Sequence, residues 1–227
     1  MNTGSMLTWL VLPYLSIVLL IVGMIWRYRT DQFGWTSRSS QWNEPAILRW
    51  SSPLFHFGVL LVFLGHVLGL VIPASWTAAI GITEDGYHVM ATVLGSLAGT
   101  CAFVGLLGLL YRRLVVGSVR MATTRMDIVT YVLLTVAMVM GCWATLHQQV
   151  LGGGYDYRQT ISPWFRSIAL LHPQPDLMAS VPLDYKMHVL AAMVLISVWP
   201  FTRLVHAVSA PLGYVTRPYV VYRSRGE

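Results

Sequence analysis

Four histidines lie within two hydrophobic stretches of this 227-residue chain, His56 and His66 in one and His188 and His206 in the other. An ionisable side chain is costly inside hydrocarbon, so residues of this kind usually mark a functional site there. Imidazole is the commonest protein ligand for metals, and two opposed imidazoles fill both axial positions of a b-type haem. The four histidines therefore predict two b-type haems stacked between two helices, an arrangement suited to electron transfer.

Structural and ionic interpretations compete with haem ligation. A lone histidine in a membrane helix is as often a hydrogen-bonded structural residue as a ligand, but four at matching depths favour ligands. The second interpretation is a metal-ion transporter, which would recruit Met, Cys or carboxylate ligands beside the histidines. Cys101 and Cys142 lie on other predicted helices, although Met187 and Met193 flank His188. The chain has no Cys-x-x-Cys and no Gly-rich phosphate loop, so its chemistry would come from a bound cofactor.

The composition indicates a membrane protein. Of the residues, 56% are hydrophobic and 11% are charged, with a mean hydropathy of +0.61, whereas soluble domains carry about 25% charged residues. A membrane-spanning helix needs about 20 mostly apolar residues. Five such stretches are predicted, at residues 7–26, 52–72, 88–111, 126–147 and 182–207. We therefore expect an all-α integral membrane protein with five transmembrane helices and no separate soluble domain.

Basic residues predict the orientation, because arginine and lysine concentrate on the cytoplasmic side of a membrane protein. Twelve of the 15 basic residues fall on one side of the predicted helices: Arg27, Arg29, Arg38, Arg49, Arg112, Arg113, Arg120, Arg125, Arg203, Arg217, Arg223 and Arg225. We therefore expect the N-terminus outside, the C-terminus in the cytoplasm, and a first helix that is not a cleaved signal peptide. The net charge of +6 reflects this bias and suits lipid head groups or an acidic partner, not nucleic acid.

Antiparallel helices determine which histidines meet. The second predicted helix runs outward and the fifth inward, so His66 pairs with His188 near the outer face and His56 with His206 near the cytoplasm. The 18-residue interval in the fifth helix keeps its histidines on one face, but the 10-residue interval in the second leaves them about 80° apart. Tilt, offset ligands or a kink at Pro200 could absorb this difference. Nearby glycines would admit a flat macrocycle: Gly58, Gly65 and Gly69.

Ordered motifs extend over most of the chain. They include Trp26-Arg27-Tyr28, Ser39-Ser40-Gln41, Leu54-Phe55-His56-Phe57-Gly58, Gly65-His66, Arg112-Arg113-Leu114 and Arg120-x-x-Thr123-Thr124-x-x-Asp127. The most specific group closes the chain: Pro200-Phe201-Thr202-Arg203-Leu204-Val205-His206, then Ser209, Pro211, Tyr214, Thr216-Arg217, Tyr219 and Arg223. Together these motifs resemble the gamma subunit, a dihaem cytochrome b, of membrane-bound respiratory nitrate reductase.

The resemblance implies a quinol-oxidising subunit of the bacterial inner membrane that serves anaerobic respiration. It implies two b-type haems, the outer held by His66 and His188 and the inner by His56 and His206. Electrons from menaquinol or ubiquinol would pass inward to an iron–sulfur beta subunit and a molybdenum-containing alpha subunit on the cytoplasmic face. Residues 1–208 would form the membrane domain, and residues 209–227 a cytoplasmic arm that contacts the partner. A related dihaem cytochrome feeding another terminal reductase remains the alternative.

Arginines near the inner haem are candidates for its propionates, because a guanidinium pairs with carboxylates through a rigid fork. Arg112, Arg113 and Arg203 all lie at the inner ends of predicted helices. Simple anchoring at the cytoplasmic interface is an equal alternative for these three residues. Lys186, two residues before His188, is a comparable candidate at the outer haem.

Quinol oxidation needs a group near the outer haem that takes a proton. Gly65, His66 and the loop from Ala74 to His88 are the expected place. Members of the family carry a lysine in this loop, and this chain has none between Trp76 and His88, so Tyr87 or His88 is the candidate in its place. The predicted spans also lack central carboxylates, which favours a redox half-loop over a proton channel.

Overall fold

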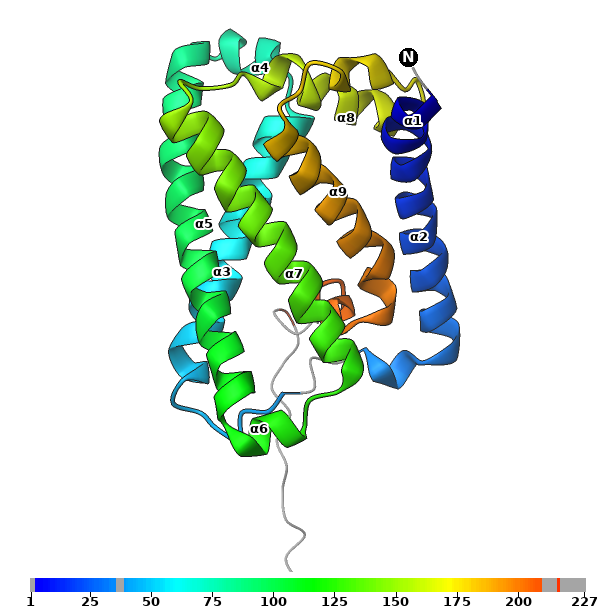
Figure 1. Ribbon diagram of the computed structural model, residues 1–227, viewed down its shortest axis with the longest axis vertical. Coiled ribbons are helices and arrows are strands. Elements are labelled where there is room, and N and C mark those ends of the chain that lie inside the picture. The colour runs from blue at the N-terminus through cyan, green and yellow to red at the C-terminus, as the bar shows by residue number, and fades with distance from the viewer. Residues whose placement is uncertain (1–2, 36–38, 210–215, 217–227) are drawn as a thin grey trace, which may run out of the picture.

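The computed structural model describes residues 3–35, 39–209 and 216, and it shows an all-helical bundle (Figure 1). Five longer helices build its length: α2 (Leu12–Thr30), α3 (Leu48–His66), α5 (Glu84–Val115), α7 (Arg125–Ala144) and α9 (Leu183–Val198). Three short helices lie at the end of the bundle that holds the N-terminus: α1 (Thr3–Met6), α4 (Ala74–Ala79) and α8 (Ile161–Ala169). The opposite end holds α6 (Gly117–Met121).

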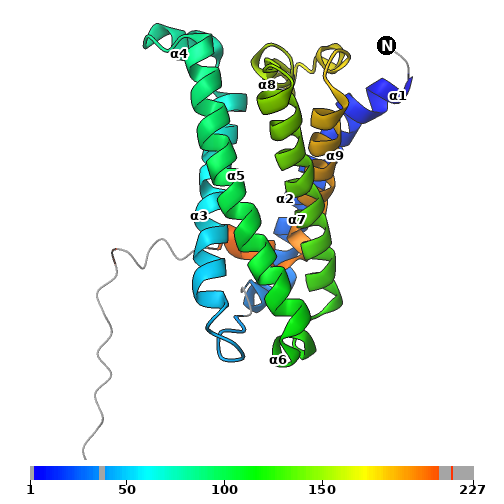
Figure 2. The ribbon, with the colours of Figure 1, turned by 60° about the vertical axis from the view of Figure 1, so that its left-hand side comes forward.

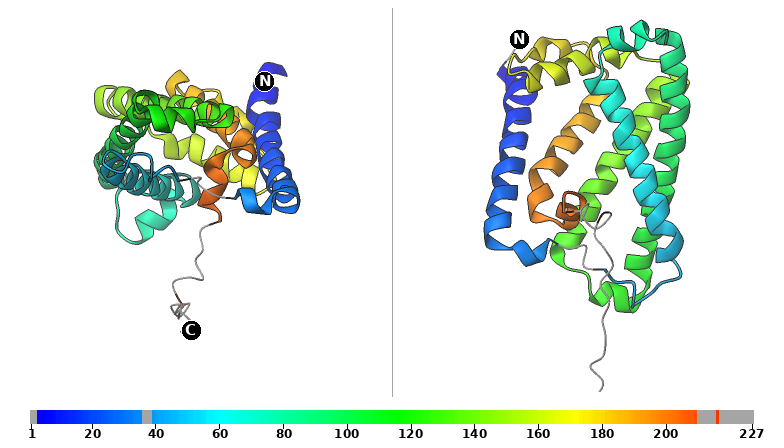
Figure 3. Two further views of the ribbon diagram at one scale, coloured as in Figure 1. Left: turned by 90° about the horizontal axis from the view of Figure 1, so that it is seen from below. Right: turned by 180° about the vertical axis from the view of Figure 1, so that it is seen from behind.

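The long helices pack as a row in which α9 contacts α2 and α7, and α5 contacts α7 and α3. Figure 2 shows α3 and α5 on one side of the molecule, with α7, α9 and α2 on the other. The view from behind in Figure 3 shows the same order across the bundle. The two histidine-bearing segments therefore lie on opposite sides of the molecule and face each other across it.

Four of the predicted spans correspond to continuous helical segments of the structure. Each segment is long and apolar enough to cross a membrane: Thr3–Thr30, Leu48–Val71, Glu84–Val115 and Arg125–Leu151. Large apolar side chains on their surfaces are widely exposed, including Val22 (59%), Phe63 (61%) and Leu97 (61%). Exposed apolar surface of this extent is unfavourable in water and favourable against lipid. The fold is therefore that of an all-helical, multi-pass membrane protein.

The predicted fifth span, residues 182–207, is not one continuous helix. Helix α9 ends at Val198, and two 3₁₀ turns follow it, Trp199–Phe201 and Arg203–Ala207. Pro200 explains the break, because proline lacks a backbone N–H and its ring clashes with the carbonyl one turn earlier. The 16 residues of α9 span about 24 Å, so this helix is shorter than the four membrane-length segments.

Three of the long segments contain a π-helical turn at the same end of the bundle: Leu7–Val11, Val67–Val71 and Thr145–Leu151. Side chains from α8 bond to carbonyl oxygens in two of these turns. The Ser162 hydroxyl donates to the Gly69 oxygen (2.7 Å), and the Trp164 indole N–H donates to the Trp9 oxygen (3.0 Å). A cluster of buried residues surrounds these bonds: Trp9, Ile161, Trp164, Ile168, Met178, Val181 and Met193. The region around α8 is therefore a packed cap on the bundle.

Glycines hold α3 and α5 in close contact. A Cβ atom on Gly58 would overlap the backbone of Ala102, and one on Gly105 would overlap the backbone of Phe55. Small residues permit this approach, which supplies much of the packing between membrane helices. The expectation that Gly58 makes room for a macrocycle is therefore wrong, whereas the Cβ direction of Gly65 is open.

This packing predicts that Gly105→Ala destabilises the protein by about 1–3 kcal/mol, because the added methyl group must push two helix backbones apart. Thermal unfolding in detergent measures the effect. Gly95→Ala on the same helix is the matched control, because no atom lies within 4 Å of its added Cβ. Equal unfolding temperatures for the two variants would contradict the close-packing interpretation.

Candidate functional site

The structure brings the four histidines together as two pairs. The ring centroids of His66 and His188 are 6.0 Å apart, and those of His56 and His206 are 6.2 Å apart. Helix α3 supplies one member of each pair. The other members come from α9 and from the 3₁₀ turn Arg203–Ala207, so the break at Pro200 lets His206 reach His56. These are the pairs that antiparallel packing predicts.

All four imidazoles are oriented in the same way, by a contact between Nδ1 and a backbone carbonyl oxygen. The contacts are His56 to Ser52 (2.7 Å), His66 to Val62 (2.8 Å), His188 to Ala137 (3.0 Å) and His206 to Arg203 (2.5 Å). A carbonyl oxygen only accepts hydrogen bonds, so each neutral imidazole carries its proton on Nδ1 and has a lone pair on Nε2. Histidines that bind metals through Nε2 typically make this second bond.

The spacing within each pair fits one metal ion between two imidazoles. A bond from a metal to an imidazole nitrogen is about 2 Å long, and the ring centre lies roughly 1 Å beyond that nitrogen. Two imidazoles on opposite sides of one metal ion therefore have centroids about 6 Å apart. The two observed distances, 6.0 and 6.2 Å, agree with this value. The residues present thus fit a bis-histidine haem at each pair.

Gly141 creates the space for the outer pair. This residue lies on α7 opposite His188, and a Cβ atom there would lie 2.8 Å from Cε1 of the imidazole. Four residues earlier, Ala137 provides the carbonyl that orients the same ring. Sequence reasoning missed Gly141, because the approach depends on how α7 packs against α9 and no local motif marks it.

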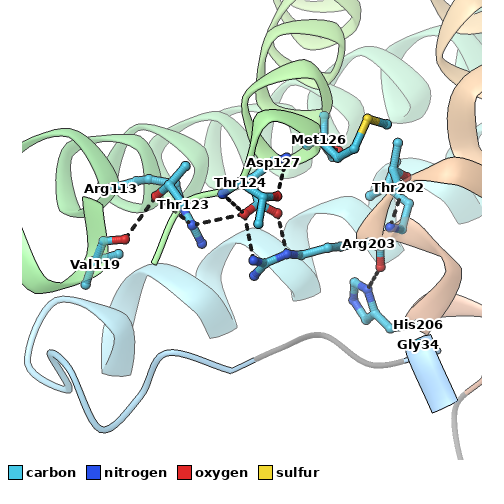
Figure 4. Close-up of polar contacts among 12 residues, drawn as sticks. Gly34, Arg113, Val119, Thr123, Thr124, Met126, Asp127, Thr202, Arg203 and His206 are labelled. Carbon is cyan, nitrogen blue, oxygen red and sulfur yellow. Dashed lines mark hydrogen bonds and ion pairs between the residues drawn. The ribbon is translucent and has the colours of Figure 1, made fainter. Parts of the chain in front are cut away.

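A buried ion pair holds the segment that carries His206. The carboxylate of Asp127 is 1% exposed and accepts a hydrogen bond from Nη2 of Arg203 at 2.6 Å. Asp127 also forms a capping box with Thr124 at the start of α7, so its own position is fixed. Figure 4 shows Arg203 between this carboxylate and the turn of His206. Because the Arg203 oxygen orients the His206 ring, Asp127 stabilises the inner pair indirectly.

The candidate propionate arginines have protein partners in the structure. Arg113 lies 3.7 Å from Asp127, in the same cluster as Arg203. Arg112 is 3% exposed and donates from Nε to Glu44 at 2.8 Å, and from Nη1 to Ser40 at 2.8 Å. These contacts attach the loop after α2 to the inner end of α5. The propionate roles of Arg112, Arg113 and Arg203 stay predictions.

The candidate quinol residues Tyr87 and His88 lie in the first turns of α5. The guanidinium of Arg158 stacks 3.9 Å from the centre of the Tyr87 ring, and the Tyr87 hydroxyl is 3.3 Å from that of Tyr157. Burial raises the pKa of Tyr157, and the bond to Tyr87 raises it further, so this phenol keeps its proton. Nε2 of His88 is buried beside Gly154 without a hydrogen-bond partner among the described residues.

These side chains border one pocket at the end of the bundle capped by α8. Its lining comes from the start of α5 and from the loop after α7, and it includes Glu84, Tyr87, His88, Gly154 and Arg158. Arg158 is buried, and it ion-pairs with Glu84 at 3.3 Å. The buried arginine was not expected from the sequence, where it counts only as an outer-side charge. The roles of Gly65, His66, Tyr87 and His88 toward quinol stay predictions.

The fold and the paired histidines define the class of protein: an all-helical membrane protein whose helices hold imidazoles in facing pairs. A family model described as nitrate reductase gamma subunit matches residues 5–225. The chain therefore belongs to the nitrate reductase gamma subunit family, the membrane cytochrome b subunits of respiratory nitrate reductase. This confirms the resemblance recognised in the sequence motifs.

Individual relatives agree with this assignment. The nitrate reductase gamma chain of Bacillus subtilis is 46% identical over 222 residues, which cover 98% of this chain and 99% of that protein. The respiratory nitrate reductase 2 gamma chain of Escherichia coli is 32% identical over 215 residues, or 94% of each chain. The nitrate reductase-like protein NarX of Mycobacterium tuberculosis is 54% identical over 230 residues, but the match covers only 35% of its length.

The ion pair at Asp127 generates a prediction about the inner site. Asp127→Asn leaves Arg203 without its carboxylate, and removing one member of a buried pair destabilises a protein by about 3–5 kcal/mol. We expect haem loss to be greatest at the inner site, with the outer site retained, as measured by haem content and by redox titration of the visible spectrum. Asp31→Asn is the control, because the Asp31 carboxylate is 53% exposed and lies 3.7 Å from Arg27. Equal loss at both sites would contradict a local tether.

Proposed function

We propose that this chain is the quinol-oxidising dihaem cytochrome b subunit of a respiratory nitrate reductase in the bacterial inner membrane. The single observation that carries the proposal is the geometry of the two histidine pairs. Each pair places two ring centroids at the spacing expected for a bis-histidine haem, and the pairs lie at different depths of one bundle. Haem supplies reversible one-electron transfer when bound, so two haems at different depths provide a route across the membrane.

The proposed topology has five spans, with the N-terminus outside and the C-terminus in the cytoplasm. Helix α9 and the 3₁₀ turns up to Ala207 would form the fifth crossing, packed between α2 and α7. The bias of 12 of 15 basic residues toward one side supports this orientation. Residues 1–208 would be the membrane domain. Residues 209–227 would be the partner-contacting arm, and they lie outside the described residues apart from Ser209 and Thr216.

In this proposal the chain's residues hold the haems and place quinol beside the outer one. His66 and His188 would ligate the outer haem, and His56 and His206 the inner haem. Menaquinol or ubiquinol would bind near Gly65 and His66, with Tyr87 and His88 of the neighbouring helix α5 as the other candidate contacts. The open Cβ direction of Gly65 supports this location, because no described side chain blocks it.

Electrons would leave at the cytoplasmic side for an iron–sulfur beta subunit and then a molybdenum-containing alpha subunit that reduces nitrate. Quinol protons would leave on the outer side, so charge would separate without protons crossing the protein. The described carboxylates support this half-loop, because Glu84, Asp127 and Asp184 all lie in the first turns of their helices. The metal-transporter alternative lacks comparable support: among the described residues, no group of three or more His, Cys, Asp or Glu side chains could hold an ion.

Haem content is the first test of the proposal. We expect two non-covalent b haems per purified chain, both reduced when a quinol analogue is added without oxygen. Quantitative extraction of haem and visible spectra measure this. A well-folded chain without haem would refute the ligand assignment.

Removal of an outer ligand tests the direction of electron flow. In the assembled complex, His66→Ala or His188→Ala is expected to abolish quinol-driven nitrate reduction, while an artificial dye that reduces the partner directly still supports it. His172→Ala serves as the control, since His172 is an exposed outer-side histidine that lies outside both pairs. Normal quinol-dependent activity in both ligand variants would contradict the proposal.

A further inference from the structure

Two aromatic rings near the end of α7 belong neither to the histidine pairs nor to the pocket at the start of α5. Trp143 and His147 are stacked, with ring centroids 5.4 Å apart and planes inclined by 18°. Trp143 is half-exposed, and so is the imidazole of His147. His147 lies within the π-helical turn Thr145–Leu151, a deviation from α-helical geometry that occurs frequently at functional sites. The pair therefore forms an accessible platform on the surface of the bundle.

The carboxylate of Asp184 fixes the orientation of this platform from the neighbouring helix α9. It accepts hydrogen bonds from Nδ1 of His147 (2.8 Å), Nε1 of Trp143 (2.9 Å) and Nε2 of Gln148 (2.5 Å). A carboxylate only accepts, so the proton of the neutral imidazole lies on Nδ1 and Nε2 keeps its lone pair. An aspartate that orients histidine in this way also stabilises the imidazolium that forms when Nε2 takes a proton.

The platform lies next to the outer histidine pair. Asp184 precedes His188 by four residues, about one helical turn or 6 Å along α9. On the opposite side of the same contact between helices, Ala137 and Gly141 of α7 surround the His188 ring. His147 follows Gly141 by six residues, between one and two helical turns, in the π-helical turn that continues α7. The imidazole is therefore just beyond the outer pair, at the end of the bundle capped by α8.

We infer that His147, oriented by Asp184, accepts the proton that quinol loses when it reduces the outer haem. The inference rests on the proposed function and names one residue within it. In each half-reaction one quinol O–H bond breaks, its electron pair stays on the quinol oxygen, and the proton moves to Nε2 of His147. The electron would be taken up by the haem that His66 and His188 would hold, and the imidazolium of His147 would then release the proton to the outer water. Two such cycles convert one quinol to quinone.

The other nearby titratable groups are less suited to this step. Nε2 of His88 is enclosed beside Gly154, whereas the imidazole of His147 is half-exposed. Hydrogen bonds join the turn of His147 to Asp184 and Tyr185 on α9. The turn also packs against α5, whose first turns carry four titratable residues: Glu84, Asp85, Tyr87 and His88. Of these groups, Asp184 alone has a hydrogen bond to His147 among the described residues.

The test is rapid-mixing reduction of the haem-loaded complex by a water-soluble quinol analogue across a range of pH. In the wild type, the rate is expected to rise with pH, because only a neutral imidazole accepts a proton. His147→Gln should slow the reduction about 100-fold and flatten this rise, in line with the usual contribution of a general base. Asp184→Asn should produce a smaller loss, because the imidazole remains but is no longer oriented. The spectrum and potential of the outer haem should stay unchanged in both variants.

Two control variants separate the alternatives. His172→Gln removes an exposed imidazole elsewhere on the outer side and should behave as wild type. A slow, pH-independent rate in His88→Gln together with normal behaviour of His147→Gln would assign the proton to His88 and overturn the inference. If quinol fails to reduce the haems of the wild type, the proposed function is itself refuted. Normal reduction of the wild type together with normal behaviour of His147→Gln refutes only the role of His147.

Chemical modification gives a readout independent of turnover. Diethyl pyrocarbonate modifies accessible neutral imidazoles, and mass spectrometry of peptides identifies each modified site. We expect His147 to react, and an oxidised, water-soluble quinone analogue to protect it while His172 stays reactive. Equal modification of His147 with and without the analogue would show that quinone does not bind there, and would overturn the inference.

Discussion

The hydrogen bond from each imidazole Nδ1 to a helix carbonyl is the interaction on which the arrangement depends. Without it, a histidine in an apolar bundle could rotate and present either nitrogen. With it, Nδ1 is occupied in all four rings, and Nε2 is left as the nitrogen with a free lone pair. Two of the carbonyls belong to α3 itself, so His56 and His66 are oriented within one helix, whereas His188 depends on α7. The outer site is therefore sensitive to how two helices pack, and the inner site to the turn after α9.

The surrounding lipid explains why so little of the chain is buried. Apolar surface gains little by moving from hydrocarbon into a protein interior, so close backbone contact has to hold membrane helices together. The glycine contacts between α3 and α5 supply it. A conventional apolar core forms only around α8, where residues from both ends of the sequence meet. That cap holds the ends of the helices together on the side of the bundle that contains the N-terminus.

The sequence predicted the elements of this molecule better than their ends. Composition located four membrane-length helices, and antiparallel order predicted both histidine pairs, because these features depend on local hydropathy and chain direction. The extent of the break at Pro200 was not predictable, since a proline can kink a helix or end it. Asp127, Gly141 and Arg158 acquire their roles through contacts with residues distant in the chain. Such contacts leave no local pattern, although the capping box at Thr124 and Asp127 was visible as part of a motif.

The π-helical turns have a consequence for how this family can diversify. One extra residue in a regular helix rotates everything beyond it by about 100°, and a π turn is the place where such a residue has been absorbed. The three turns lie at one end of the bundle, close to the ends of three of the membrane-length segments. A single-residue insertion or deletion at these turns would therefore reorient the side chains at this end of the bundle and leave the register of the rest of each span intact. Evolution could in this way change the side chains at this end of the bundle independently of the two histidine pairs.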